Sequence, residues 1–599
     1  MRRRTLTGSL LTLTTTTALV LAASVASASP QATTAQAASP TAVGFGGAAA
    51  TVDTLATEAA IGVLRRGGNA VDAAVAAAAV LGVTEPFSCG IGGGGFMVIY
   101  RARDGKLTTI DHREAAPAAM RPDSFFAGGA PLPFNDARYS GLSVGVPGTV
   151  DGWADALDRY GTISLGEALL PAIAVAARGF TVDQTFVDQT AANVDFFDDI
   201  TSSRALFLDA DGTPHDVGTR FRNPDLARTY ARIALLGPRG FYRGALAAAI
   251  TEAVTHPPLA PGANHIWRPG VMAAEDLRGY GAIERPPTKV SFAGLDVYSM
   301  GPPSSGGSTV GEALNILAGL PIGGTREQTL HYFLEASRYS FADRNAYLAD
   351  PEYFDVPLRG LLSEEFAKER RNLITDRAAT SPVPPGNPYP FQGAPAPQAP
   401  EPSVTNTRPG TTTHLTVSDR WGNVVSYTFT IESTGGSGIV VPGYGFLLNN
   451  ELTDFNFDSL THPNRVESGK RPRSSMSPTI VLRDGRPVLA LGSPGGSTII
   501  TTVLQILIDR FALGTPLPEA IAAPRLSQRN TAATTVEAAV LTTPEAAALL
   551  ARGHTLVAGA EIGAATAIEF LDHGRLLAVA EPVRRGGGSA MVVHPASSP

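Results

Sequence analysis

Residues 410–419, Gly-Thr-Thr-Thr-His-Leu-Thr-Val-Ser-Asp, place three consecutive threonines at the start of a predicted strand. The preceding residues 380–409 are rich in proline, which disfavours a helix or a central strand there. A strand that begins against such a segment is a favourable place for the chain to be cut. A cut before Thr412 would give this residue a free amine, which can act as the base for its own hydroxyl. We therefore predict that the chain cleaves itself at this point and that Thr412 is the nucleophile.

A hairpin turn centred on Trp421 sets the register of this strand against residues 424–430. The predicted pairs are 418 with 424, 416 with 426, 414 with 428 and 412 with 430. Strand alternation then separates an apolar face, with Leu415, Val417, Val425, Tyr427 and Phe429, from a polar face, with Thr412, His414, Thr416, Ser426, Thr428 and Thr430. The Thr430 hydroxyl should therefore lie close enough to hydrogen-bond Thr412. For this hairpin taken alone, an ordinary threonine-rich strand remains an alternative.

The composition of the 599 residues indicates a soluble α/β or α+β protein with a large core or several domains. A net charge of −7 argues against nucleic acid as the main partner. Residues 1–28, with three early arginines, an apolar run and Ala-Ser-Ala at the end, are typical of a signal peptide. We expect an exported protein, by either the general or the twin-arginine route. No later stretch is apolar enough to span a membrane.

The rest of the chain should position the threonine strand between helices. We expect helices over residues 50–64 and 70–81, with Asn69 as an N-cap, and a strand over 97–101. Further helices are predicted over 330–348, 498–512, 517–523 and 544–552, and strands over 413–419, 424–431, 478–482 and 487–491. Cys89 is the only cysteine, so no intrachain disulfide can form, and a small buried residue is the expected role.

Two short motifs suggest other chemistry, and their context argues against both. Residues 90–95 fit the dinucleotide-binding pattern G-x-G-x-x-G, but they precede a strand where that motif requires a helix. Residues 141–145 fit G-x-S-x-G, the nucleophile elbow of α/β-hydrolases, with Ser143 at its centre. This serine remains the second candidate for a nucleophile. The ten histidines show no metal-ligand spacing, so we predict neither a metal nor a cofactor.

Longer motifs follow one another along nearly the whole chain in a single order. In the C-terminal part they are TTH at 412–414, LLNNELTDF at 447–455, RPRSSMSP at 471–478 and GSPGGS at 492–497. In the N-terminal part they are GGNAVDAAV at 67–75, EPFSCGIGGGGF at 85–96, DHREAAP at 111–117, VGVPG at 144–148, PPSSGG at 302–307 and ADR at 342–344. Together these motifs resemble the γ-glutamyltranspeptidase family.

The resemblance implies an N-terminal-nucleophile hydrolase, an α+β protein with an αββα sandwich, made as a precursor that cuts itself into two subunits. The large subunit would span residues 29–411, ending in a Pro-rich mobile tail at about 380–411, and the small subunit residues 412–599. Three threonines in a row leave the cut ambiguous by one residue. Thr412 is chosen because the family's nucleophile stands two residues before the histidine, and because the register pairs it with Thr430.

The resemblance also implies roles for the site residues. The freed α-amine of Thr412, with an ordinary pKa of about 8, would be its base. The N–H groups of Gly495 and Gly496 would form the oxyanion hole. A γ-glutamyl substrate carries an α-carboxylate and an α-ammonium. Arg113, helped by the hydroxyls of Ser474 and Ser475, would bind the carboxylate, and Glu451 and Asp454 would bind the ammonium.

The chain departs from the family pattern at two places. Glu432 stands where many members have asparagine, which makes the ammonium end of the pocket more acidic. The segment between Asp454 and Ser474 is shorter than in members with a lid loop, so the site should be more open. We expect a γ-glutamyltransferase and hydrolase acting on glutathione and related amides, with water, amino acids or peptides as acceptors. A related acylase acting on glutaryl or cephalosporin side chains, or a catalytically dead secreted binding protein, remains an alternative.

Overall fold

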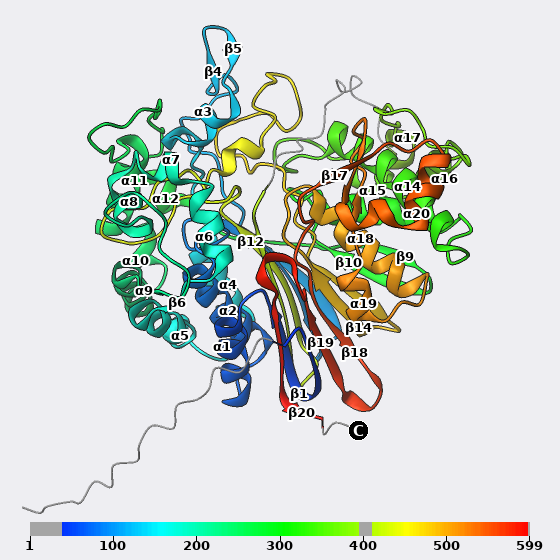
Figure 1. Cartoon of the computed structure of the whole chain (residues 1–599), viewed down its shortest axis with the longest axis horizontal. Helices are drawn as coiled ribbons and strands as arrows, with labels where there is room; N and C mark the ends of the chain where they lie inside the picture. Colours follow the sequence, from blue (N-terminus) through cyan, green and yellow to red (C-terminus); the bar gives the residue numbers. More distant parts are fainter. Residues whose placement is uncertain (1–38, 394–409, 597–599) are drawn as a thin grey trace, which may run out of the picture. The chain divides into compact units, whose positions relative to one another are not determined.

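The computed structural model describes residues 39–393 and 410–596. The predicted signal peptide and residues 394–409, which are half of the predicted Pro-rich tail, lie outside these described residues. The largest element is an antiparallel sheet of 13 strands, in the order β8-β3-β2-β12-β11-β1-β19-β18-β14-β13-β10-β9, with β20 paired to β1 (Figure 1). Its strands are β1 (Thr41–Thr51), β2 (Gly94–Arg101), β3 (Lys106–Asp111), β8 (Ile283–Arg285), β9 (Thr288–Phe292), β10 (Leu295–Ser299), β11 (Thr413–Asp419), β12 (Val424–Thr430), β13 (Thr479–Arg483), β14 (Arg486–Gly492), β18 (Thr566–Phe570), β19 (Leu576–Ala580) and β20 (Ser589–Pro595).

This sheet folds back on itself and forms two packed layers, and β1 belongs to both. The first half of β1 pairs with β19 and the second half with β11. As a result β11 and β12 lie against β14 and β18 without pairing to them. Side chains connect the layers: the hydroxyl of Ser426 donates to the Leu491 carbonyl at 3.0 Å, and that of Thr416 to the Thr566 carbonyl at 3.3 Å.

Helices cover the outer face of each layer. The helices α1 (Thr54–Arg65) and α2 (Ala70–Thr84) contact β1, β11, β12 and β20, with α4 (Thr149–Tyr160), α5 (Leu165–Arg178) and α9 (Pro224–Leu236) beyond them. On the other layer α13 (Gly306–Leu317), α18 (Thr498–Phe511) and α19 (Leu517–Ala522) contact β9, β10, β14 and β19, and α14 (Arg326–Tyr347) packs on α13. The predicted αββα sandwich is confirmed (Figure 1).

Smaller elements complete the described chain. The other helices are α3 (Phe134–Arg138), α6 (Gln184–Ala191), α7 (Val194–Phe197), α8 (Thr201–Phe207), α10 (Arg239–Tyr242), α11 (Gly244–Thr255), α12 (Ala274–Gly279), α15 (Leu358–Leu361), α16 (Glu364–Arg371), α17 (Tyr389–Gln392) and α20 (Pro544–Ala551). The minor sheets contain β4 (Phe126–Ala127), β5 (Ala130–Pro131), β6 (Phe180–Thr181), β7 (Arg220–Phe221), β15 (Leu526–Ser527), β16 (Thr534–Glu537) and β17 (Leu556–Gly559). No described helix combines the length and the apolar character needed to cross a bilayer.

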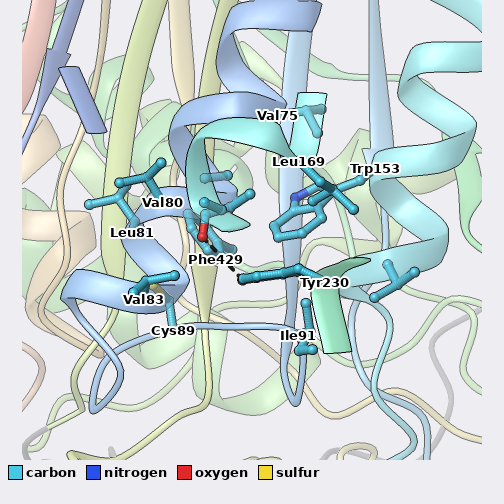
Figure 2. Packing of buried hydrophobic residues seen from close by; sticks show 14 of the residues in the cluster. Val75, Val80, Leu81, Val83, Cys89, Ile91, Trp153, Leu169, Tyr230 and Phe429 are labelled. Atoms are coloured by element: carbon cyan, nitrogen blue, oxygen red, sulfur yellow. Dashed lines mark hydrogen bonds between the residues drawn. The ribbon is translucent and has the colours of Figure 1, made fainter. Parts of the chain in front are cut away.

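The predicted hairpin register is confirmed within β11 and β12. His414 lies opposite Thr428, Thr416 opposite Ser426 and Ser418 opposite Val424. The apolar face of the hairpin packs into the core beneath α2, where Figure 2 shows Phe429 among Val80, Leu81 and Cys89. Burial raises the pKa of the Cys89 thiol, as fits the small core residue that was predicted.

The first helix was predicted to begin too early. Ala50 belongs to β1, and α1 begins at Thr54 after Asp53, whose carboxylate accepts from the Ala56 N–H at 2.9 Å. The alanines of this stretch favour a helix intrinsically, but their small side chains also fit between the two layers, and packing overrides propensity. The next helix begins as predicted, because the Asn69 side chain accepts from the N–H groups of Val71 and Asp72.

Part of the Pro-rich segment is ordered by its own contacts. Contrary to the expectation that no helix would form there, α17 occupies Tyr389–Gln392. Proline stands near the start of this short helix, where its missing N–H costs nothing. Val383 exchanges two hydrogen bonds with the side chain of Asn530, at 2.8 and 2.9 Å. The chain is thus attached to residues beyond the predicted cut before it reaches residues 394–409.

Candidate active site

One pocket opens at the ends of β11 and β12 and is lined by residues from distant parts of the chain. Its empty volume is about 550 Å³, counting the part open to solvent. Every predicted site residue except Gly495 lines it, namely Arg113, Thr412, Thr430, Glu432, Glu451, Asp454, Ser474, Ser475 and Gly496. The lining also includes residues that were not predicted: Arg344, Gly410, Arg473, Met476, Ser497 and Ile499. The motifs that lie far apart in the sequence therefore converge on one site.

Two threonine hydroxyls surround the peptide carbonyl that precedes Thr412. The Thr412 Oγ1 lies 2.7 Å from the Thr411 carbonyl oxygen and 3.2 Å from Thr430 Oγ1. The Thr430 hydroxyl donates to the same carbonyl at 2.7 Å, and it accepts from the Glu432 N–H at 2.8 Å. The predicted proximity of Thr412 and Thr430 is confirmed. A hydroxyl donor on this carbonyl polarises it toward attack by the neighbouring oxygen.

The peptide around Thr412 is held from several directions. The Thr411 N–H donates to the Glu432 carbonyl at 2.8 Å, and the Thr411 hydroxyl donates to the Phe87 carbonyl at 3.2 Å. On the other side, Arg585 Nη1 donates to the Thr412 carbonyl at 2.7 Å. Sequence reasoning missed Arg585, because it comes from the far end of the chain and no spacing relates it to the hairpin. The three contacts fix the carbonyl and the hydroxyls relative to one another.

His414 supports the strand and does not face the pocket. Its Nδ1 lies 2.7 Å from Thr428 Oγ1, and burial lowers its pKa to about 3, so the ring is neutral. A side chain on Gly492 would collide with this ring, since a Cβ there would lie 2.3 Å from it. A histidine at this position and a glycine at the end of β14 are therefore matched to each other.

Glycines let the backbone come close to the ends of β11 and β12 from two sides. A Cβ on Gly93 would lie 1.9 Å from the Thr430 carbonyl oxygen, so the glycine-rich residues 90–95 bring β2 against β12. Gly495 and Gly496, at φ of 132° and 58°, form the turn from β14 to α18. Their N–H groups have no hydrogen-bond partner among residues 39–393 and 410–596. They are thus available to an oxyanion, although their role stays a prediction.

Arg113 is already paired with both predicted ammonium partners. It is almost fully buried, its Nη1 contacts Glu451 Oε1, and its Nη2 lies 2.6 Å from Asp454 Oδ2. Its Nε donates to the Pro472 carbonyl at 3.2 Å. The sequence suggested separate cationic and anionic ends of the pocket, whereas these three side chains form a single cluster. A substrate carboxylate can bind only those N–H groups of Arg113 that do not already contact Glu451, Asp454 or the Pro472 carbonyl.

The carboxylates of the site are held in a poorly solvated environment. Burial raises the pKa of Glu451 well above its usual range, and it raises that of Glu432 to about 7, with the nearby Asp454 adding to the increase. The Glu432 carboxylate accepts from Ser433 and Asn450. Glu432 also holds a left-handed backbone conformation, with φ of 79°, which is strained for a residue with a side chain.

The two serines line the pocket and contact Arg344 of α14 and Ser305. Ser475 Oγ accepts from Arg344 Nη2 at 2.7 Å, which leaves its own proton free to be donated into the pocket. Ser474 Oγ accepts from the Met476 N–H at 3.1 Å, and the Ser474 carbonyl accepts from Ser305. Arg344 lies in the ADR motif of α14, so its presence in that motif was the one signal that could have identified it.

Other candidate sites do not take part. Ser143 is fully buried in a short turn of 3₁₀-helix, and its hydroxyl donates to the Arg138 and Ser140 carbonyls, so the nucleophile-elbow alternative is wrong. Residues 90–95 lead into β2 and open no helix. Within the described part of the chain, no three His, Cys, Asp or Glu side chains come together in a way that could hold a metal ion.

Comparisons with known proteins agree with this site. A family model described as gamma-glutamyltranspeptidase matches residues 56–591. The glutathione hydrolase proenzyme of Bacillus subtilis (strain 168) is 39% identical over 491 residues, which cover 81% of this chain and 81% of that protein. The acylase ACY 1 proenzyme of Pseudomonas sp. (strain V22) is 34% identical over 570 residues, covering 92% and 95%.

The solved structures show the same fold. The crystal structure of cephalosporin acylase from Bacillus halodurans superposes with a TM-score of 0.80 at 28% identity, covering 94% of this chain and 98% of that one. The family match extends over most of the sequence and includes every motif at the pocket. This chain therefore belongs to the γ-glutamyltranspeptidase family.

Proposed function

We propose that the protein is a γ-glutamyltransferase and hydrolase that works through a γ-glutamyl ester on Thr412. The observation that carries the proposal is the position of the Thr412 and Thr430 hydroxyls on the Thr411 carbonyl, inside a pocket lined by three arginines and three carboxylates. The relatives named glutathione hydrolase support glutathione and similar γ-glutamyl amides as donors. Water, or the amine of an amino acid or peptide, takes the acyl group.

The first reaction is the cleavage of the chain itself. Thr412 Oγ attacks the Thr411 carbonyl carbon, a C–O bond forms, and the C–N bond between the two residues breaks. The hydroxyl proton passes to the amine that is released. Water then hydrolyses the ester, which leaves a carboxylate on Thr411 and a free amine and hydroxyl on Thr412. The products are a large subunit of residues 29–411 and a small subunit of residues 412–599. A signal peptide at residues 1–28 precedes the large subunit in the precursor and directs export.

Turnover repeats the same bond changes on the substrate. The free amine of Thr412 takes the proton of its hydroxyl as the oxygen attacks the γ-carbonyl of the donor. The N–H groups of Gly495 and Gly496 receive the negative charge that develops on the carbonyl oxygen. The protonated amine gives its proton to the leaving amine, and the γ-glutamyl group remains on Thr412 as an ester. Water or a second amine attacks this ester and restores the enzyme.

An acylase that removes glutaryl groups is the second candidate. The acylase ACY 1 proenzyme and the cephalosporin acylase are similar to 92% and 94% of this chain. A glutaryl group has a carboxylate but no amine, so it requires no anionic partner. Because burial raises the pKa values of Glu432 and Glu451, the pocket is less anionic near neutral pH than its residue types suggest.

The pH dependence of donor choice distinguishes the two. The Glu432 carboxyl, with a pKa of about 7, is mostly neutral at pH 6 and mostly charged at pH 8. Only the charged form attracts an ammonium. We expect kcat/KM for γ-glutamyl-p-nitroanilide, divided by that for glutaryl-p-nitroanilide, to rise about tenfold over this range. Titration of the Thr412 amine affects both substrates and cancels in the ratio.

A Glu432→Gln variant supplies the control. The amide keeps the shape of the side chain without its titration, so the ratio should become flat between pH 6 and 8. If the wild-type ratio is itself flat, Glu432 does not bind the ammonium. Turnover of the glutaryl compound alone would replace the transferase assignment with the acylase.

A further inference from the structure

Two buried arginines on the pocket wall have no acidic partner. Arg344 and Arg473 are about 5% exposed, and both line the pocket with Ser474 and Ser475. Among the described residues, neither guanidinium has a carboxylate oxygen within the 4.0 Å of an ion pair. Buried charges in proteins are normally paired. The Asp454 carboxylate raises the pKa of both arginines, but its ion pair is with Arg113.

The hydrogen bonds of Arg473 are long and incomplete. Its Nη1 reaches the carbonyls of Arg344, Asn345 and Leu348 at 3.4 to 3.5 Å, and its Nη2 reaches the side chain of Asn456 at 3.4 Å. Typical N–H···O distances are near 2.9 Å. The buried Nε has no partner among the described residues. Burial lowers the Arg473 pKa to about 10, so the side chain is still charged at neutral pH.

Arg344 makes shorter hydrogen bonds than Arg473, but these bonds do not use all of its N–H groups. Its Nε donates to Ser305 at 2.8 Å, its Nη1 to Asn345 at 3.0 Å and its Nη2 to Ser475 at 2.7 Å. A guanidinium has five N–H groups, so two remain after these three bonds. All three partners are neutral, so Arg344 lacks a counterion among the described residues, and burial together with the neighbouring Arg473 lowers its pKa.

None of the pocket's three carboxylates pairs with Arg344 or Arg473. Glu451 and Asp454 contact Arg113, and the Glu432 carboxylate accepts from Ser433 and Asn450. The carboxylate of the γ-glutamyl group is assigned to Arg113, so it leaves these two arginines without a partner. A ligand that brings one more negative charge would supply the missing partner through charge-assisted hydrogen bonds.

We propose that Arg473 and Arg344 form a second anion-binding subsite, which takes a carboxylate on the part of the substrate that leaves or that accepts the γ-glutamyl group. This inference rests on the proposed function, because the α-carboxylate of the donor is assigned to Arg113, Ser474 and Ser475. The preferred substrates are then γ-glutamyl compounds whose amine portion is itself acidic, such as a peptide with a free C-terminus. Arg473 determines this preference. Arg344 contributes to the same subsite and also orients Ser475 through its hydrogen bond to the Ser475 hydroxyl.

The test uses two donors that differ by one carboxylate, γ-glutamyl-p-nitroanilide and γ-glutamyl-3-carboxy-4-nitroanilide. We expect the wild-type enzyme to favour the carboxylated donor in kcat/KM, and Arg473→Gln to lower that preference about tenfold. Arg473→Lys keeps the charge without the planar fork and should lie between the two. A fall in kcat/KM that is equal for both donors, or no change in their ratio, overturns the proposal.

Two controls separate this subsite from folding and from the proposed function. Arg465 belongs to the same segment but pairs with Glu467 outside the pocket, so Arg465→Gln removes one charge and should leave the ratio unchanged. Calorimetric titration with 5-amino-2-nitrobenzoate, the amine released from the carboxylated donor, requires no turnover. Tighter binding to the wild type than to Arg473→Gln supports the subsite even if neither donor is hydrolysed, and equal binding argues against it.

Discussion

Replacing Thr412 with alanine should leave the chain uncut and lower turnover by at least about 10³-fold. The substitution removes the oxygen that lies against the Thr411 carbonyl, and with the peptide intact no free amine is produced. A denaturing gel of purified protein should show one polypeptide where the wild type shows two. The rate of p-nitroaniline release from γ-glutamyl-p-nitroanilide measures the loss of turnover. If the protein is instead a catalytically dead binding protein, the wild-type chain should also remain uncut.

The neighbouring threonines are matched controls for this experiment. Among the described residues, the Thr411 hydroxyl bonds the Phe87 carbonyl alone and the Thr413 hydroxyl has no partner, so Thr411→Ala and Thr413→Ala leave the contacts of Thr412 Oγ1 in place. Both variants should still cut, and Thr412→Ser should cut because it keeps an oxygen at the same place. N-terminal sequencing of the small subunit should begin at residue 412. Cleavage of Thr412→Ala, or a small subunit that begins at 411 or 413, would remove Thr412 from its role.

The hairpin could be predicted from the sequence because its information is local. Alternation of apolar and hydroxyl side chains over two short strands fixes the register, since a shift by one residue would exchange the faces. The same pattern predicts that Thr430 lies beside Thr412, and their hydroxyl oxygens are 3.2 Å apart. Helices with clear caps, such as the one after Asn69, were predicted for the same reason. The other members of the site followed from the motifs of the family.

Contacts between distant segments could not be predicted in this way. Arg585 and Arg473 come from segments with no periodic pattern, so only the folded chain shows that Arg585 contacts the Thr412 carbonyl and that Arg473 lines the pocket. The pairing of Arg113 with Glu451 and Asp454 was missed because each was assigned to the substrate separately. The start predicted for the first helix, at residue 50, was too early, because local propensity carries no information about packing against the second layer of the sandwich.

Replacing Thr430 with valine should slow self-cleavage by about 10² to 10³-fold while leaving the hairpin intact. The Thr430 hydroxyl donates to the Thr411 carbonyl at 2.7 Å, where negative charge develops when Thr412 attacks, and loss of one such donor has an effect of this size. The same hydroxyl accepts from the Glu432 N–H, so the valine variant also leaves that N–H without this hydrogen bond. The rate is measured as the disappearance of purified precursor on a gel over time. Thr430→Ser keeps the donor and should cleave at close to the wild-type rate.

The control for a general effect on the strand is Thr428→Val, two residues earlier on the same face. Its hydroxyl contacts His414 Nδ1 at 2.7 Å and does not reach the Thr411 carbonyl. We expect the Thr428 variant to lose stability in thermal unfolding but to cleave within a few-fold of the wild-type rate, whereas the Thr430 variant should do the reverse. If both variants cleave equally slowly, the Thr430 hydroxyl acts by holding the strand. Only a selective loss at Thr430 assigns its hydroxyl to the Thr411 carbonyl at which the cut is predicted.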